Sequence, residues 1–161
     1  MGRMKMRLVP SVLLCFLAVL LGACSGYGTH PKQVVFVCEH GAGRSVIAAA
    51  WFNKLAGEKQ LPYRAVARGV TPQDELSKPT VAGLKKDGLA FLNEKPRGLS
   101  RQEANEAIRV VSFFPLPTSL KPAAFDQFEV PGPGDGYDQS RDAVLVHVRK
   151  LIEDLQTSHA R

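Results

Sequence analysis

Residues 38–45, with the sequence CEHGAGRS, bring together the groups that oxyanion chemistry needs. Cys38 supplies a thiol, two glycines leave backbone N–H groups accessible, and Arg44 can hold an anion through two N–H donors at once. An anion-binding loop needs such convergent N–H groups, and a helix that starts behind it adds its positive dipole end. Such a field favours the thiolate form of a cysteine. The segment therefore predicts a nucleophilic cysteine in an oxyanion-binding loop.

The residues on either side of this segment predict the elements that position it. The apolar run VVFV precedes Cys38, and the apolar run VIAAAWF follows Ser45. The first run predicts a buried strand and the second a buried helix, so the loop lies between them. A structural cysteine in an ordinary strand–helix turn is the alternative, but it would leave the glycines and Arg44 without a role.

The spacing Cys-x5-Arg-Ser resembles the loop of the low-molecular-weight protein tyrosine phosphatases and of the arsenate reductases that share their fold. In that family the cysteine attacks phosphorus or arsenic, and the arginine holds the equatorial oxygens. The resemblance implies that Cys38 is the nucleophile, Arg44 the transition-state clamp and Ser45 the hydroxyl that bonds the thiolate. It also implies that the reaction needs no metal and no other cofactor.

The resemblance implies that the residues between the cysteine and the serine bind the substrate. These residues, with the serine, are Glu39, His40, Gly41, Ala42, Gly43, Arg44 and Ser45. Gly41 stands where many relatives have asparagine, and glycine can adopt the same left-handed backbone conformation. We expect His40 to point outward and shape the entrance, although a role as a base remains open, and we expect Glu39 to face away from the anion.

The residue that protonates the leaving group is the weakest point of the resemblance. Phosphatases of this family carry an Asp-Pro before the last helix, whereas the corresponding stretch here reads VPGP, with Gly132 in place of the acid. Asp135 and Asp138 are the candidates to replace it, and we name Asp135 as the catalytic acid. A turn at Asp135 and a helix cap at Asp138 are their structural alternatives. Tyr137 is the nearest aromatic residue that could contact a substrate, or else a core or hinge residue.

The predicted function is hydrolysis of phosphomonoesters through a phosphocysteine, with a phosphate-bearing small molecule or a phosphoprotein as the substrate. Two alternatives stay open: a single-cysteine arsenate reductase that uses an external thiol, and a non-catalytic oxyanion-binding lipoprotein. No cysteine follows Cys38, which excludes the relay through several cysteines that thioredoxin-coupled reductases use. The basic residues form no run and have no interleaved aromatic residues, so we expect no nucleic-acid partner.

The N-terminal residues predict export. Residues 1–23 have three basic residues, no acidic one and an apolar stretch, as in a signal peptide, and their removal lowers the net charge from +6 to +3. The sequence LGAC, ending at Cys24, resembles a bacterial lipobox, which implies lipid attachment at Cys24 and a tether over residues 24–32. We expect a lipoprotein at the periplasmic face of a bacterial membrane; an ordinary secretory signal is the alternative.

The remaining chain predicts one α/β domain over residues 33–158. Strand and helix patterns alternate, which indicates a four-stranded parallel sheet flanked by helices, with the Cys-x5-Arg loop after the first strand. The expected helices are 44–59, 77–87, 100–107 and 140–155, and the expected later strands are 63–70, 109–114 and 126–130. Arg64 and Arg68 are expected on the solvent side of the second strand.

Overall fold

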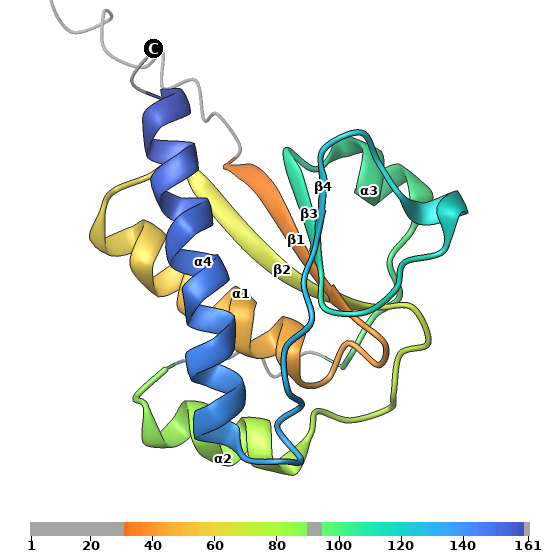
Figure 1. Cartoon of the computed structure of the whole chain (residues 1–161), viewed down its shortest axis with the longest axis vertical. Coiled ribbons are helices and arrows are strands. Elements are labelled where there is room, and N and C mark those ends of the chain that lie inside the picture. The colour runs from red at the N-terminus through yellow and green to blue at the C-terminus, as the bar shows by residue number, and fades with distance from the viewer. Residues whose placement is uncertain (1–30, 90–94, 160–161) are drawn as a thin grey trace, which may run out of the picture. The chain divides into compact units, whose positions relative to one another are not determined.

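The computed structural model describes residues 31–89 and 95–159, which belong to one compact unit. Four strands form a parallel sheet in the order β2-β1-β3-β4, as predicted (Figure 1). The strands are β1 (Lys32–Cys38), β2 (Tyr63–Gly69), β3 (Arg109–Ser112) and β4 (Phe125–Gln127). The helices are α1 (Arg44–Glu58), α2 (Lys78–Lys86), α3 (Arg101–Glu106) and α4 (Tyr137–His159), with a short 3-10 turn, η1, at Thr118–Leu120.

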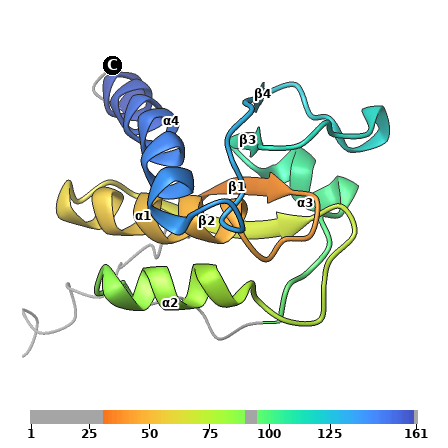
Figure 2. The same cartoon turned by 60° about the horizontal axis from the view of Figure 1, so that its bottom comes forward.

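The central strand β1 explains why helices cover both faces of the sheet. Val34, Val35, Phe36 and Val37 are all fully buried, so successive side chains need an apolar partner on opposite faces. On one face Val34 and Phe36 pack against residues of α1 and α4. On the other face Val35 and Val37 pack against residues of and around α3. Figures 1 and 2 show α1 and α4 on one side of the sheet and α3 on the other.

Several element boundaries differ from the sequence-based expectation. The first strand, β1, begins at Lys32. The fourth strand covers Phe125–Gln127 instead of 126–130, and α4 begins at Tyr137, three residues earlier than expected. The prediction that Arg68 lies on the solvent side was wrong: Arg68 is buried and its guanidinium binds the Glu103 carboxylate at 2.6 Å and 2.8 Å.

The signal peptide over residues 1–23 and lipid attachment at Cys24 lie outside the described residues. Among residues 31–89 and 95–159, no helix has the length and apolar character needed to cross a membrane.

Candidate active site

The loop between β1 and α1 is held in shape from outside by the segment that follows β2. The N–H groups of Val70 and Thr71 donate to the Glu39 carbonyl, at 2.9 Å and 2.8 Å. Gln73 donates in the same way to the His40 carbonyl at 3.1 Å, and Ser77 to the Ala42 carbonyl at 2.9 Å. In a trans peptide the C=O and N–H groups point in opposite directions, so the N–H groups of His40, Gly41 and Gly43 point away from these partners. This arrangement is compatible with the predicted oxyanion-binding loop.

Gly41 is the point at which the loop needs a glycine. Its φ is +63°, in the left-handed region that was expected for it. A Cβ at Gly41 would also lie 2.8 Å from the backbone nitrogen of Gly69, and a Cβ at Gly69 would lie 2.7 Å from that of Gly41. The loop and the end of β2 can approach this closely only because both residues lack a side chain.

The thiol lies at the base of the loop, where β1 ends. Cys38 is 4% exposed, and its Sγ lies 3.1 Å from Oγ of the fully buried Ser45, in the hydrogen bond that the motif predicted. Gly43 is the N-cap residue of α1, and no side chain caps this helix end. The positive end of the helix dipole is thus left directed at the loop. Cys38 is the only cysteine in the described part of the chain, and it is free.

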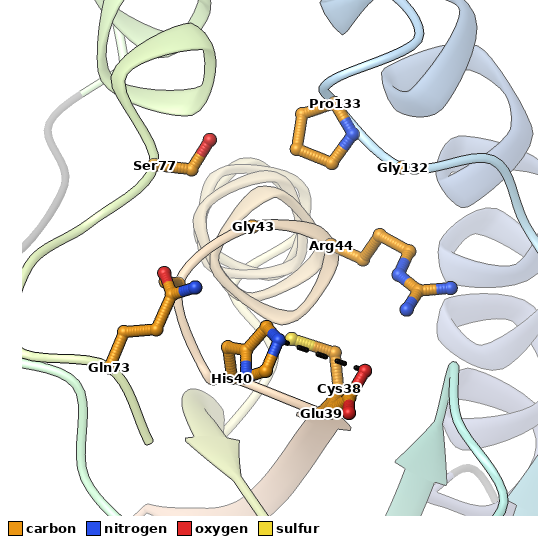
Figure 3. A pocket seen from close by; sticks show the side chains of 10 residues that line it. Cys38, Glu39, His40, Gly43, Arg44, Gln73, Ser77, Gly132 and Pro133 are labelled. Carbon is orange, nitrogen blue, oxygen red and sulfur yellow. Dashed lines mark ion pairs between the residues drawn. The ribbon is translucent and has the colours of Figure 1, made fainter. Parts of the chain in front are cut away.

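A pocket of about 230 Å³ opens above this thiol (Figure 3). Its lining consists of Cys38, Glu39, His40, Ala42, Gly43, Arg44, Gln73, Ser77, Gly132 and Pro133. Five of the predicted substrate-binding residues therefore line the pocket together with Cys38. Gly41 and Ser45 do not: Gly41 faces the end of β2, and Ser45 is buried beside the thiol.

Arg44 lines the pocket, but its guanidinium is bound to another part of the wall. Nη1 donates to the Val130 carbonyl at 3.1 Å. Figure 3 shows the side chain extending toward the segment that carries Gly132 and Pro133. Five N–H donors on one guanidinium leave four besides the one that binds Val130, so an anion can be bound while this contact persists.

Glu39 and His40 lie at the pocket mouth. Both residues line the pocket, and their side chains are about half exposed, at 47% and 46%. His40 Nε2 lies 3.7 Å from the Glu39 carboxylate, the ion pair drawn as a dashed line in Figure 3. His40 Nδ1 lies 3.2 Å from the Thr71 carbonyl, which ties the ring to the segment after β2.

The segment before α4 reaches the pocket through Gly132 and Pro133 only. Asp135 does not line the pocket; one of its carboxylate oxygens lies 3.9 Å from the position that a Cβ on Gly132 would take. Asp138 is turned away, because its carboxylate binds Lys86 at 3.0 Å and Arg141 at 2.7 Å. The Lys86 hydrogen bond, above all, lowers the pKa of Asp138, which is the opposite of what a proton donor at neutral pH requires.

Tyr137 is a structural residue and does not line the pocket. Its hydroxyl donates to Asp87 at 2.7 Å, and its ring packs directly over Gly83 of α2. Burial, followed by the hydrogen bond to Asp87, raises the pKa of Tyr137 well above its ordinary value. The apolar residues after β3 also form a buried corner: Phe113 and Leu116 are 2% and 4% exposed.

Gln73, Ser77 and Pro133 are the pocket residues that sequence reasoning missed. Ser77 precedes α2 as expected of a cap, but its side chain makes no capping bond and instead points toward the pocket (Figure 3). No local pattern marks Gln73, which reaches the pocket only because its backbone binds the His40 carbonyl. No group of three or more histidine, cysteine or acidic side chains in the described residues is arranged to hold a metal ion.

Comparison with known proteins places this site in a familiar fold. No protein-family model matches the chain, and no curated protein matches it in sequence. Solved structures do match. The low-molecular-weight protein tyrosine phosphatase of T. tengcongensis is 20% identical, with a TM-score of 0.61 over 76% of this chain and 99% of the other. The arsenate reductase of Archaeoglobus fulgidus is 26% identical, with a TM-score of 0.61 over 74% and 98%.

A third solved structure is the YwlE arginine phosphatase in a mutant form with a phosphorylated active-site serine. It is 21% identical, with a TM-score of 0.68 over 78% of this chain and 96% of the other. The parallel sheet, the flanking helices and the position of Cys38 after the first strand agree with this group of structures. The chain therefore has the fold shared by the low-molecular-weight protein tyrosine phosphatases and the arsenate reductases.

Proposed function

We propose that the chain hydrolyses phosphomonoesters through a phosphocysteine formed on Cys38. The observation that carries this proposal is the position of the buried thiol, which lies beside Ser45 and below a loop whose carbonyls are bound on the outside. An anion in the pocket would meet inward N–H groups and the Arg44 guanidinium, while the thiol lies behind it. This is the arrangement that stabilises charge on a phosphoryl group as it is transferred.

The reaction has two displacements at phosphorus. In the first, the Cys38 sulfur forms a bond to phosphorus as the bond to the leaving oxygen breaks, and that oxygen takes up a proton. In the second, water attacks the phosphocysteine, loses a proton, and the thiolate leaves, with the Ser45 hydroxyl donating to it. The loop N–H groups and Arg44 bind the three equatorial oxygens in both steps. The phosphorylated active-site serine of the YwlE mutant supports a covalent route on this fold.

The proton donor is the part of this mechanism that the geometry supports least. Asp135 stays a prediction, since its carboxylate lies near the Gly132 backbone but outside the pocket lining. Reaching a leaving group would require the segment before α4 to move. Asp138 no longer qualifies, because its carboxylate is held by Lys86 and Arg141.

Arsenate reduction with an external thiol is the second candidate function. Two observations favour it. Cys38 is the only cysteine in the described residues, and the pocket wall has glycine at position 132, in place of a general acid. Cys38 would attack arsenic with loss of water, and a small thiol would then attack the Cys38 sulfur, so that the As–S electron pair reduces As(V) to arsenite and a mixed disulfide remains. A second small thiol would reduce that disulfide, and no further cysteine from this chain is needed. Simple oxyanion binding is the third candidate, but a binding protein has little use for a thiol at this position.

Turnover of p-nitrophenyl phosphate by residues 29–161 under reducing conditions tests the main proposal. Replacing Cys38 by Ser should lower kcat by at least about 10³-fold, because an alkoxide is not available in place of the thiolate. The folded variant should still bind phosphate, and this is measured by calorimetry. Turnover that survives in Cys38→Ser would contradict the covalent route. If the wild-type chain shows no turnover while arsenate or phosphate protects Cys38 from alkylation, the reductase or binding function would be favoured.

We also propose that the mature protein is exported and held at the periplasmic face of a bacterial membrane by lipid on Cys24. The support is the basic and apolar leader followed by LGAC. In a bacterial host, the full chain should take up labelled palmitate and fractionate with membranes, and Cys24→Ala should abolish both. Cys15→Ala is the matched control and should change neither. Export without labelling would instead support the ordinary secretory signal.

A further inference from the structure

The ionisable side chains at the mouth of the pocket come from the loop between β1 and α1. In the described part of the chain, the charged or titratable side chains that line the pocket are Glu39, His40 and Arg44, besides the Cys38 thiol. The opposite wall, from the segment before α4, contributes Gly132 and Pro133, neither of which can donate a proton from its side chain. A proton for the leaving group must therefore come from the loop, from solvent, or from a residue outside the lining.

The contacts of His40 determine which ring nitrogen can exchange a proton. Nδ1 lies 3.2 Å from the Thr71 carbonyl, and a carbonyl oxygen can only accept a hydrogen bond, so Nδ1 carries hydrogen. This leaves Nε2 as the nitrogen that gains and loses the proton. Nε2 lies 3.7 Å from the Glu39 carboxylate. Arg44 is the other charged side chain on the pocket lining.

We propose that His40 is the general acid of the phosphatase reaction and takes the place of the aspartate that the chain lacks at position 132. This inference rests on the proposed function. As the Cys38 sulfur binds phosphorus, the bond to the leaving oxygen breaks and the Nε2 proton moves to that oxygen. In the second step neutral His40 takes a proton from the attacking water, which returns the imidazolium as the thiolate leaves. Protons and charge therefore balance over one cycle.

Glu39 acts in this scheme as a positioning residue. Its carboxylate faces the ring from the same loop, while the Thr71 carbonyl holds the other nitrogen from the segment after β2. Gln73, which also lines the pocket on that side, carries no charge. The ring is thus held between a backbone acceptor and a carboxylate, and about half of the side chain is exposed to solvent. In the view of Figure 3, Glu39, His40 and Cys38 lie together at the end opposite Pro133.

Varying the leaving group of the substrate distinguishes a catalytic role of His40 from a merely structural one. A general acid matters most when the departing oxygen is strongly basic and hardly at all when it is weakly basic. The substrates are phenyl, p-nitrophenyl and 2,4-dinitrophenyl phosphate, and the first displacement is followed as the phenol released in a single turnover. In His40→Asn, whose amide nitrogen can keep a donor near the Thr71 carbonyl, the rate with phenyl phosphate should fall by about 10²–10⁴-fold. The rate with dinitrophenyl phosphate should fall by less than about tenfold, which also shows that the variant is folded.

Two further variants complete the experiment. His147→Asn makes the same substitution on α4, at a histidine that stacks on Phe128 and does not line the pocket, and it should keep the wild-type dependence on leaving group. Glu39→Gln should show a weaker form of the His40→Asn pattern. An equal loss for all three substrates in His40→Asn would overturn the proposal, since a structural role affects every substrate alike. If the selective loss of rate with phenyl phosphate appears in Asp135→Asn instead, the proposal is overturned and Asp135 is the general acid.

The proposed function fails in a different way. If the wild-type chain releases no phenol from any of the three phosphates, including the dinitrophenyl ester, hydrolysis itself is overturned and the role of His40 with it. If the wild type is active and only the selective loss is missing, the phosphocysteine route stands and His40 is not its acid.

Discussion

The contact between Cys38 and Ser45 would serve both chemical steps of the proposed reaction. The two side chains are separated by 3.1 Å and are buried together, so the hydroxyl has no competing water. A hydrogen bond to a charged partner contributes about 1.5–3 kcal/mol. In the proposed phosphatase reaction, this bond would keep the attacking thiolate in place in the first step and stabilise the same thiolate as it leaves phosphorus in the second.

Ser45→Ala should therefore slow the breakdown of the phosphocysteine more than its formation. The expected loss is about tenfold to a hundredfold in the second step, so a burst of nitrophenol should precede a slow steady state. Rapid-quench or stopped-flow measurement with p-nitrophenyl phosphate detects this burst. Ser158→Ala is the control, because that hydroxyl donates only to the Asp154 carbonyl at the end of α4. A steady-state rate equal to that of the wild type would contradict this role for Ser45.

Residue properties that depend on local chemistry could be predicted from the sequence, and those that depend on distant partners could not. The left-handed Gly41 and the Cys38–Ser45 contact follow from one loop and one helix start. The bond from Arg44 to the Val130 carbonyl joins residues 86 positions apart, and that from His40 to Thr71 joins residues 31 apart. No periodicity carries that information.

Helices α2 and α4 meet through one glycine and one aromatic ring. Tyr137, the first residue of α4, packs its ring over Gly83 of α2, where a Cβ would lie 2.1 Å from the nearest ring atom. The phenol donates to Asp87, which follows α2, and Arg141 binds the same carboxylate at 3.3 Å. Gly83 is thus in a helix for its small size, although glycine disfavours a helix by about 1 kcal/mol relative to alanine.

Gly83→Ala should lower the free energy of unfolding by about 1–3 kcal/mol, because the methyl group displaces a packed ring and outweighs the gain in helix propensity. Gly57→Ala, in α1, is the matched control: nothing lies within 4 Å of its Cβ position, so it should raise stability by about 0.5–1 kcal/mol. Urea unfolding of both variants measures the two signs. If Gly83→Ala raised the free energy of unfolding, the Tyr137 ring would have to move aside at little cost, which would contradict this account of the α2–α4 contact.

The existence and order of the elements could be predicted from hydrophobic pattern, and their ends were less certain. Ser100 caps α3 by accepting a hydrogen bond from the Glu103 N–H at 3.0 Å. The Glu103 carboxylate, however, binds Arg68 rather than completing a capping box. Alternation placed Arg68 on a solvated face because it carries no sign of a partner 35 positions later in the chain. Likewise α4 begins at Tyr137 because tertiary packing on α2 extends it.

At the scale of the whole molecule, the site lies at the edge of the sheet where open parallel sheets bind ligands. Cys38 ends β1, and its neighbours in the sheet are β2 and β3, so the loop lies at the carboxyl ends of the strands. This position could be predicted from the strand–loop–helix order alone. The opposite pocket wall could not, since it comes from Gly132 and Pro133 in the segment before α4, of which Pro133 lies next to Gly43. At 20–26% sequence identity to the solved structures, the chain shares their fold.

The direction of β1 also determines how far the pocket lies from the point where the chain enters the domain. Lys32 starts the strand, next to Pro62, and Cys38 ends it, so the pocket and the start of the domain lie at opposite edges of the sheet. Seven residues of strand separate these edges by about 20 Å. If palmitate labelling places a lipid on Cys24, the attachment would lead to the edge remote from the thiol. The chain that carries the lipid would then enter the domain about one strand length away from the pocket.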